Sequence, residues 1–359
     1  MMVLDFIKEH SNWKELLGNE PYSLAIKEKD GYCLLKYNQL ESDMSLPLVQ
    51  LCRGIIIDLE NMKVACRRFD KFFNHGEPNA ARLEGKIRAE EKVDGSIIGL
   101  WCGRDGQWNI STNGMIDASD ADVFIPTDDA RTYRDLFELA WRKAGIGFDI
   151  LDKDYTYIFE LVSPLNRIVV PYKETELYFL GMRHNESGQE VSPIDTDLGQ
   201  YFKVPRIYPI DTLEQAIEVA KTLSGAEEGF VLVDENFNRV KVKGAEYLQL
   251  HLLRNNDLSL RSFLATVLEG KQDDLLGYFP EYEPYIRDIE DRLAKYKLTV
   301  REAIEAAPWD ADRKSFAMEV KDLPCSNILF KLYSNRDYDW EADVITIDNI
   351  NKLIQWLGL

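Results

Sequence analysis

The run Lys-Val-Asp-Gly-Ser at residues 92–96 contains the lysine whose setting is most specific to one kind of chemistry. A lysine at the head of Lys-x-Asp-Gly can act as a nucleophile that bonds covalently to a nucleotide phosphate. Because an unperturbed lysine is almost wholly protonated at neutral pH, this reaction needs cationic neighbours or burial to lower the pKa of the ammonium. The alternative is a solvated lysine before an Asp-Gly turn between strands.

The run Arg239-Val240-Lys241-Val242-Lys243 can supply such cations. If it is a strand, its three basic side chains project from one face and both valines from the other. That row of charge would bind a triphosphate and lower the pKa of a nearby lysine amine. The alternative is an exposed edge strand whose lysines discourage aggregation.

Two glutamates are placed where burial is expensive. Glu160 lies inside the apolar run 157–162, and Glu228 immediately precedes the apolar run 229–233. A carboxylate among apolar side chains is costly to bury unless it is paired or lies near a metal. The alternative for Glu160 is a side chain on the sheet face that is turned toward solvent.

Arg53 enters the apolar run 54–59, and the segment Lys71-Phe72-Phe73-Asn74 joins a cation to aromatic rings. A guanidinium suits phosphate or carboxylate, whereas Lys71 and Phe73 suit a phosphate contact with base stacking. The alternatives are a structural ion pair for Arg53 and core packing for the phenylalanines.

The elements that must position these residues are mostly short strands. Up to about residue 245 we predict strands at 54–59, 96–102, 108–112, 155–162, 168–172, 177–183, 229–234 and 239–243, and helices at 5–17, 132–144 and 213–223. This pattern favours an α+β fold with largely antiparallel sheets. Strand-helix alternation and the glycine-rich phosphate-binding motifs of doubly wound folds are missing.

A second, all-helical domain is predicted in the C-terminal part, giving domains at 1–248 and 249–359. Apolar residues recur at helical intervals at Tyr285, Ile289, Leu293 and Tyr296, and again at Ile350, Leu353, Ile354 and Leu357. Pro280, Pro284, Pro308 and Pro324 should divide this part into several short helices rather than one long coil.

Size and composition set limits on the kind of protein. A chain of 359 residues fits two domains, and no stretch approaches a membrane span. Five cysteines without a Cys-x-x-Cys pair argue against a disulfide framework and structural zinc, and favour the cytoplasm. The net charge of −19 argues against tight nonspecific binding to long nucleic acid, and favours recognition of a particular end or shape.

Together, these segments resemble the covalent nucleotidyltransferase superfamily of ATP-dependent ligases and capping enzymes, and most closely the phage T4 RNA ligase 1 type. The resemblance spans roughly residues 45–255 and rests on 52–54, 71–74, 92–96, the Phe-Glu-Leu-Val-Ser-Pro run at 159–164 with Asn-Arg-Ile-Val at 166–169, 228–229 and 241–243. One departure is Asn113, where the family pattern has a lysine before the glycine. An amide there brings no charge, so a phosphate or RNA contact made at this position would be weaker.

The resemblance implies an antiparallel-sheet nucleotidyltransferase domain followed by a smaller helical domain for RNA specificity. The implied activity is an ATP-dependent RNA ligase that joins 5′-phosphate and 3′-hydroxyl RNA ends through lysyl-AMP and RNA-adenylate intermediates, in RNA and tRNA repair. The implied cofactors are ATP and Mg²⁺, with Mn²⁺ as a substitute. We expect a monomer without membrane attachment, in the host cytoplasm if the gene is of phage origin.

The resemblance also implies a role for each site residue. Lys92 would be the nucleophile, and the catalytic set would be Lys92, Glu160, Glu228, Lys241 and Lys243. The ATP-binding set would be Arg53, Lys71, Phe73, Lys92, Asp94, Gly95, Glu160, Glu228, Lys241 and Lys243. Magnesium would be held through water by Glu228 and Glu160, although Glu160 could instead contact the ribose.

Two other functions fit parts of the pattern. A DNA-nick ligase or a capping-type nucleotidyltransferase shares the motifs, but both groups usually carry an oligonucleotide-binding barrel, and no such pattern follows Lys243. A catalytically inactive RNA-binding protein on the same scaffold is the non-enzymatic alternative. It is opposed by the retention of Lys92, Glu160, Glu228 and both motif lysines.

Overall fold

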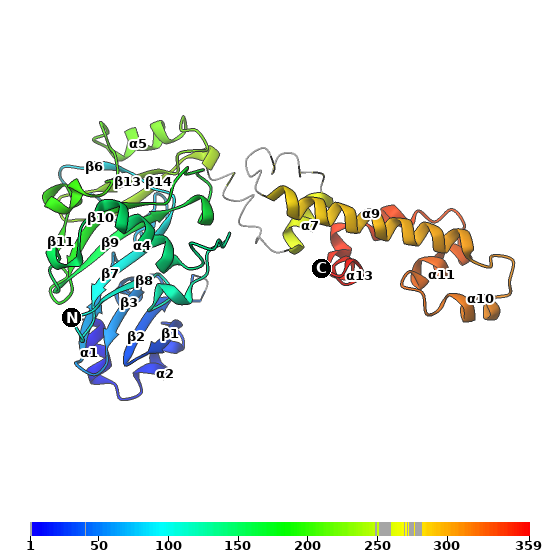
Figure 1. Ribbon diagram of the computed structural model, residues 1–359, viewed down its shortest axis with the longest axis horizontal. Helices are drawn as coiled ribbons and strands as arrows, with labels where there is room; N and C mark the ends of the chain where they lie inside the picture. The colour runs from blue at the N-terminus through cyan, green and yellow to red at the C-terminus, as the bar shows by residue number, and fades with distance from the viewer. Residues whose placement is uncertain are drawn as a thin grey trace. The chain divides into compact units, whose positions relative to one another are not determined.

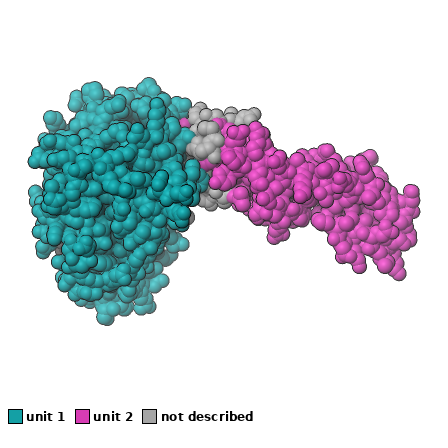
Figure 2. Space-filling view, viewed as in Figure 1, with its two compact units in different colours: residues 1–249 teal, residues 250–359 magenta. Residues whose placement is uncertain are grey.

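The computed structural model describes residues 2–39, 41–247, 250, 260–268, 270, 272, 276 and 282–359. The chain divides into two compact units, Met1–Gln249 and Leu250–Leu359, drawn in separate colours in Figure 2. The domain boundary predicted at 248/249 lies outside the described residues.

Three sheets build the first unit (Figure 1). The first has the order β1-β2-β3-β4, with β1 Leu24–Lys29, β2 Tyr32–Tyr37, β3 Arg53–Asp58 and β4 Lys63–Cys66. The second has the order β11-β10-β9-β7-β8, with β7 Ser96–Cys102, β8 Trp108–Thr112, β9 Tyr155–Val162, β10 Glu176–His184 and β11 Glu190–Val191. The third has the order β12-β6-β13-β14-β5, with β5 Phe73–Asn74, β6 Arg88–Glu91, β12 Ile207–Tyr208, β13 Gly229–Val233 and β14 Arg239–Lys243. All neighbouring strands are antiparallel except β14 and β5, so the predicted α+β class is confirmed.

Helix α4 (Tyr133–Ala144) packs on the second sheet. Thr132 caps it, because its side chain accepts a hydrogen bond from the Asp135 amide while the Asp135 carboxylate bonds back to the Thr132 amide. The helix buries Phe137 and Trp141, and Phe137 meets Phe159 of β9 edge to face, with ring centroids 5.8 Å apart. This aromatic core fixes β7 and β9, the two central strands of the sheet.

Helix α5 (Leu213–Ala220) covers one face of the third sheet, where Ala216 and Ala220 pack with Val242 and its neighbours. Strand β14 alternates as predicted: Val240 and Val242 are buried, whereas its three basic side chains are only partly buried. The cationic side of this strand therefore faces away from the core under α5.

Short helices cover the first sheet: α1 (Met2–Glu9), α2 (Trp13–Gly18) and α3 (Pro47–Leu51). The single helix predicted at 5–17 is wrong in its continuity, since a turn at 11–12 separates α1 from α2. Ser11 and Asn12 favour such interruptions because their side chains compete for backbone hydrogen bonds.

The strand predicted at 168–172 is also wrong, because this segment forms bends. The amides of Val169 and Val170 do not join a sheet ladder. Both donate to the Asp94 carboxylate, each at 2.7 Å. The Asp94 carboxylate thus accepts the hydrogen bonds that a neighbouring strand would otherwise accept.

The second unit is helical, as predicted. Its helices are α7 (Leu260–Leu268), α9 (Glu283–Ala306), α10 (Arg313–Val320), α11 (Ser326–Ser334), α12 (Trp340–Val344) and α13 (Ile350–Leu357). Pro284 lies in the first turn of α9, Pro308 follows that helix and Pro324 precedes α11, whereas Pro280 lies outside the described residues. At 24 residues, α9 is longer than the short helices expected.

Among the described residues, no helix combines the length and apolar character needed to span a membrane. All five cysteines lie in the described part of the chain, and each is a free thiol there.

Candidate active site

Lys92 lies in the short connection between β6 of the third sheet and β7 of the second. Its amide donates to the Gly229 carbonyl at 2.9 Å, which fixes the backbone beside the start of β13. Its side chain is 20% exposed, and Nζ lies 2.7 Å from Oε2 of Glu228, which is only 4% exposed. The predicted nucleophile is therefore held at the junction of two sheets by a buried carboxylate.

Glu228 bridges two lysines. Its other oxygen, Oε1, lies 3.1 Å from Nζ of Lys243 on β14. Burial alone would raise the pKa of Glu228, but the positive charges of Lys92 and Lys243 outweigh burial and lower it. Glu228 is therefore ionised across the neutral pH range and holds both ammonium groups in place.

Lys241, on β14, has a strongly lowered pKa. Burial lowers the pKa of its ammonium to about 7, and neighbouring cations, Arg53 first among them, add to the shift. Its Nζ also lies 4.8 Å from the centroid of the Phe72 ring. A poorly solvated cation of this kind is strongly favoured by an arriving anion.

Arg239, the third basic residue of β14, is engaged differently. Its guanidinium pairs with Oε2 of Glu190 at 2.7 Å and lies over the Phe69 ring at 4.1 Å. It therefore contributes less uncompensated charge than Lys241.

Arg53 begins β3 and faces the same region as Lys241. Its guanidinium lies 5.1 Å from the centroid of the Phe72 ring, so the Arg53 and Lys241 cations both approach this ring. Its buried Nη1 has no hydrogen-bond partner in the described part of the chain. A buried donor without a partner is costly, and a bound anion would satisfy it.

Glu160, on β9, lines the same cavity as Lys92. Burial raises the pKa of its carboxyl to about 7; the Lys92 charge opposes the shift, and Glu228 adds to it. Near neutral pH this group can therefore donate a hydrogen bond or accept one, depending on its protonation.

Several of these side chains line one cavity of about 230 Å³, whereas Glu228 and Lys243 do not line it. Its charged lining is Arg53, Glu90, Glu91, Lys92, Glu160, Arg239 and Lys241, and its uncharged lining is Phe69, Phe72, Val93, Gly95, Ile97, Leu180, Pro205 and Val231. Apolar walls with a few converging charged groups are typical of a small-molecule site. The arrangement suits a ligand with a planar apolar part and an anionic part.

Some predicted site residues lie just outside this cavity. Lys71 and Phe73 line a second cavity of about 200 Å³, which shares Phe72 and Arg239 with the first. Lys71 Nζ lies 5.3 Å from the centroid of the Phe73 ring, and Phe73 itself is buried. The aromatic rings on the main cavity are Phe69 and Phe72, whereas the predicted site residue was Phe73.

Asp94 has a role that its motif alone does not reveal. It is 3% exposed, and its carboxylate accepts hydrogen bonds from the amides of Val169 and Val170 and from the Tyr247 hydroxyl, the last at 2.8 Å. Burial raises the pKa of Asp94, nearby Glu228 adds to the rise, and the three donors oppose it. Asp94 thus ties the Lys92 motif to the 169–170 segment and to the end of the first unit.

Asn113 lies by the start of β3, with its carbonyl oxygen 2.7 Å from the position that a Cβ on Gly54 would occupy. Its buried Oδ1 has no hydrogen-bond partner within the described ranges. Gly54 has φ +79°, so glycine is required there by both its backbone conformation and this close approach.

Few side chains of the described residues could bind Mg²⁺ directly at this site. Within the described residues no group of three or more His, Cys, Asp or Glu side chains could hold a metal ion. Both oxygens of Glu228 are engaged by lysines, and Glu160 has a raised pKa. The two carboxylates fit an ion that is held mainly by substrate phosphates and water, which is the usual setting of Mg²⁺.

Comparison with known proteins gives a consistent match. A family model described as RNA ligase matches residues 51–247. A baculovirus chain from Autographa californica nuclear polyhedrosis virus, whose name joins polynucleotide kinase and RNA ligase, is 27% identical over 89% of this chain, which spans only 48% of that relative. The RNA ligase of Rhodothermus phage RM378 is 28% identical, with 76% of this chain and 78% of that protein covered. Among solved structures, an archaeal ATP-dependent RNA ligase aligns over 98% of both chains, with a TM-score of 0.48 and 16% identity.

Proposed function

Because this chain belongs to the RNA ligase family of the T4 RNA ligase 1 type, we propose that it is an ATP-dependent RNA ligase that works through an adenylate on Lys92. The observation that carries the proposal is the Lys92 side chain, which lines a cavity together with Arg53, Lys241 and Glu160 and lies 2.7 Å from Glu228. A nucleophile, phosphate-binding cations and carboxylates converge on one ligand-sized space.

The first step is adenylylation. The Lys92 ammonium gives up its proton to solvent, and the Glu228 carboxylate, whose pKa is lowered, holds the side chain in place at 2.7 Å. The free amine then forms a bond between Nζ and the α-phosphorus of ATP, the bond from that phosphorus to the bridging oxygen breaks, and pyrophosphate leaves with the bonding electrons. Lys241 and Lys243 offset the charge that develops on the phosphate oxygens.

Magnesium, when bound, neutralises charge on the phosphates of ATP, and Glu228 and Glu160 would hold it through water. Arg53, whose Nη1 has no hydrogen-bond partner among the described residues, is suited to a phosphate or to the ribose. Lys71, from the adjoining cavity, is suited to the outer phosphates.

Two further displacements at phosphorus complete the reaction. An oxygen of an RNA 5′-phosphate attacks the phosphorus of the lysyl-AMP, the P–N bond breaks and the lysine is released. A 3′-hydroxyl then attacks the activated 5′-phosphate, forms the phosphodiester and expels AMP. In both steps positioning and charge neutralisation supply most of the catalysis.

The two units divide this work in our proposal. The first unit carries the nucleotidyltransferase chemistry, and the helical unit selects the RNA, with broken tRNA as the natural substrate. A cytoplasmic location fits the five free cysteines, and we propose a monomer from the family resemblance alone.

Labelling with ATP that is radioactive at the α-phosphate tests the proposal. With magnesium present, the wild-type chain should become labelled, and neither Lys92→Ala nor a reaction with GTP should give the band. Lys86→Ala is the matched control, because Lys86 is an exposed lysine just before β6 and should leave labelling unchanged. An unlabelled wild-type protein would contradict the enzymatic proposal.

Sealing assays then define the substrate. We expect 5′-phosphorylated single-stranded RNA to be joined or circularised, and nicked duplex DNA to remain open. Preferential sealing of the DNA nick would contradict the RNA assignment while leaving the adenylylation step intact.

A further inference from the structure

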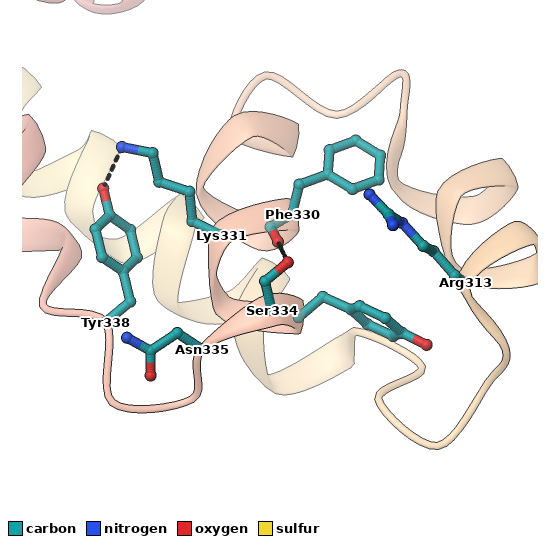
Figure 3. Close-up of a pocket in the computed structure, with 7 residues that line it drawn as sticks. Arg313, Phe330, Lys331, Ser334, Asn335 and Tyr338 are labelled. Carbon is teal, nitrogen blue, oxygen red and sulfur yellow. Dashed lines mark hydrogen bonds between the residues drawn. The ribbon is translucent and has the colours of Figure 1, made fainter.

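The helical unit contains a cavity of its own, of about 380 Å³, over the C-terminal part of α11. Its lining includes Arg313 at the start of α10, Phe330, Lys331 and Ser334 of α11, and Asn335 and Tyr338 in the segment that follows (Figure 3). None of these residues takes part in the chemistry proposed for Lys92.

Phe330 gives the cavity a fixed aromatic surface. Its ring is 36% exposed, although it belongs to a helix with a buried face. Behind it, the buried Phe316 ring meets Phe330 edge to face at 6.0 Å and packs on Tyr333 at 4.3 Å. Because these contacts hold the ring in place, a planar ligand could stack on it with little loss of side-chain entropy.

Arg313 gives the cavity an uncompensated cation. Among the described residues it has no ion pair or hydrogen bond, and it lines the cavity together with Phe330. Lys331 differs, because its Nζ is paired with Asp343 at 2.8 Å and bonded to the Tyr338 hydroxyl at 3.2 Å. An anionic ligand group would therefore bind at Arg313 rather than at Lys331.

Asn335 adds a hydrogen-bond donor. Its Oδ1 accepts from the Asp337 amide at 3.1 Å, which fixes the side-chain amide. Within the described ranges Nδ2 has no acceptor, so it is available to a ligand. A ring, a guanidinium and an oriented amide are the three groups that recognise a single nucleotide.

We propose that this cavity binds one unpaired nucleotide of the RNA substrate. The base stacks on Phe330, the adjacent phosphate pairs with Arg313, and the Asn335 amide donates to an acceptor on the base edge. The inference rests on the proposed RNA ligase function and assigns the helical unit a defined contact with single-stranded RNA.

Binding of a short, unstructured, 5′-phosphorylated RNA to the full chain without ATP tests this site. We expect Phe330→Ala to weaken the affinity about tenfold, the typical scale for the loss of one stacked base. Phe330→Trp, which keeps an aromatic face, should bind like the wild type. Met318→Ala is the matched control, since Met318 is 66% exposed on α10 and does not line the cavity.

The phosphate contact has a separate signature. Arg313→Gln should weaken binding and reduce the slope of log affinity against log salt by about 0.7, the value for one phosphate contact on a single strand. Lys314→Gln removes the same charge from the next residue, outside the cavity, and should leave the slope unchanged.

The outcomes separate this inference from the ligase proposal. All these variants should label with ATP like the wild type, because Lys92 and its neighbours are untouched. If the wild type labels but Phe330→Ala and Arg313→Gln bind RNA as tightly as the controls, the cavity is not an RNA site and a protein partner becomes the better occupant. If the wild type does not label, but both variants bind RNA more weakly than the wild type, the cavity assignment stands and the ligase proposal falls.

Discussion

Replacing Tyr247 with phenylalanine should destabilise the first unit by removing a single hydroxyl. That hydroxyl donates to Oδ1 of Asp94 at 2.8 Å, and Tyr247 is 1% exposed. The other carboxylate oxygen is already bonded to the amides of Val169 and Val170. After the substitution, Oδ1 remains buried without its donor, next to the negative charge of Glu228.

The size of the effect follows from the kind of bond that is lost. A hydrogen bond to a charged group is worth about 1.5–3 kcal/mol, and a buried acceptor left unpaired costs a similar amount. We therefore expect the free energy of unfolding to fall by about 2 kcal/mol at pH 8. Burial and Glu228 already raise the pKa of Asp94, and losing a donor that favours the ionised form raises it further. The deficit should therefore shrink as the pH falls and Asp94 becomes protonated in the folded state.

Amide hydrogen exchange of β7 and β9 is the appropriate measurement, because global unfolding of a chain with two units mixes their transitions. Tyr201→Phe is the control: this tyrosine is 48% exposed, and its loss of a hydroxyl should leave protection unchanged. A Tyr247→Phe deficit below about 0.5 kcal/mol at pH 8, or one that does not vary with pH, would refute the role given to the Asp94 carboxylate.

Three further predictions concern other buried positions. The pKa of Glu160 is raised to about 7, so the stability it contributes is present below its unfolded pKa and lost as the pH rises through 7. The unfolding free energy of the wild type should therefore fall relative to Glu160→Gln between about pH 5 and 8, by on the order of 3 kcal/mol, and parallel pH profiles in hydrogen exchange of β9 would contradict this. Gly95→Ala should lower the unfolding free energy by about 2 kcal/mol and slow Lys92 labelling, because the new Cβ would lie 2.5 Å from the Leu161 carbonyl oxygen. Gly18→Ala, whose new Cβ would meet no atom within 4 Å outside its own helix and chain neighbours, should leave hydrogen exchange of β7 and β9 unchanged. Tyr296→Phe should stabilise the helical unit by about 1 kcal/mol in exchange measurements on α9, because the buried Tyr296 hydroxyl has no hydrogen-bond partner in the described part of the chain; a loss of protection would reveal a partner.

Much of the architecture could be predicted from local pattern. The strand at 239–243 and its two faces followed from strict alternation, and the helix predicted at 132–144, observed at 133–144, followed from helical periodicity. The α+β class, the helical C-terminal part and the resemblance to the T4 RNA ligase 1 type are all confirmed. These features depend on short sequence windows, in which the period of the side chains determines the element.

The site depended on contacts that no short window contains. Asp94 meets Val169 across 75 residues and Tyr247 across 153, so the motif gives no sign that its carboxylate organises two distant segments. The same contact explains the wrong strand at 168–172, whose β-branched residues matched strand propensity. Phe72 rather than Phe73 lines the main cavity, a choice decided by the direction of a two-residue strand.

The electrostatics also differ from what the spacing of charges suggested. We expected the cations of β14 to act on Lys92, and the pKa lowered to about 7 belongs to Lys241. Lys92 instead forms an ion pair with Glu228. We had predicted that Glu228 binds magnesium through water, and that prediction did not include a contact with Lys92. The roles of these residues in catalysis remain predictions.

The adduct itself tests the central claim most directly. After incubation with ATP and magnesium, the protein should be digested and its peptides analysed by mass spectrometry. We predict one added adenylyl group, on the nitrogen of Lys92, that is lost when pyrophosphate or 5′-phosphorylated RNA is supplied. An adenylyl group on a different residue, or an unmodified Lys92 peptide from an enzyme that seals RNA, would contradict the account.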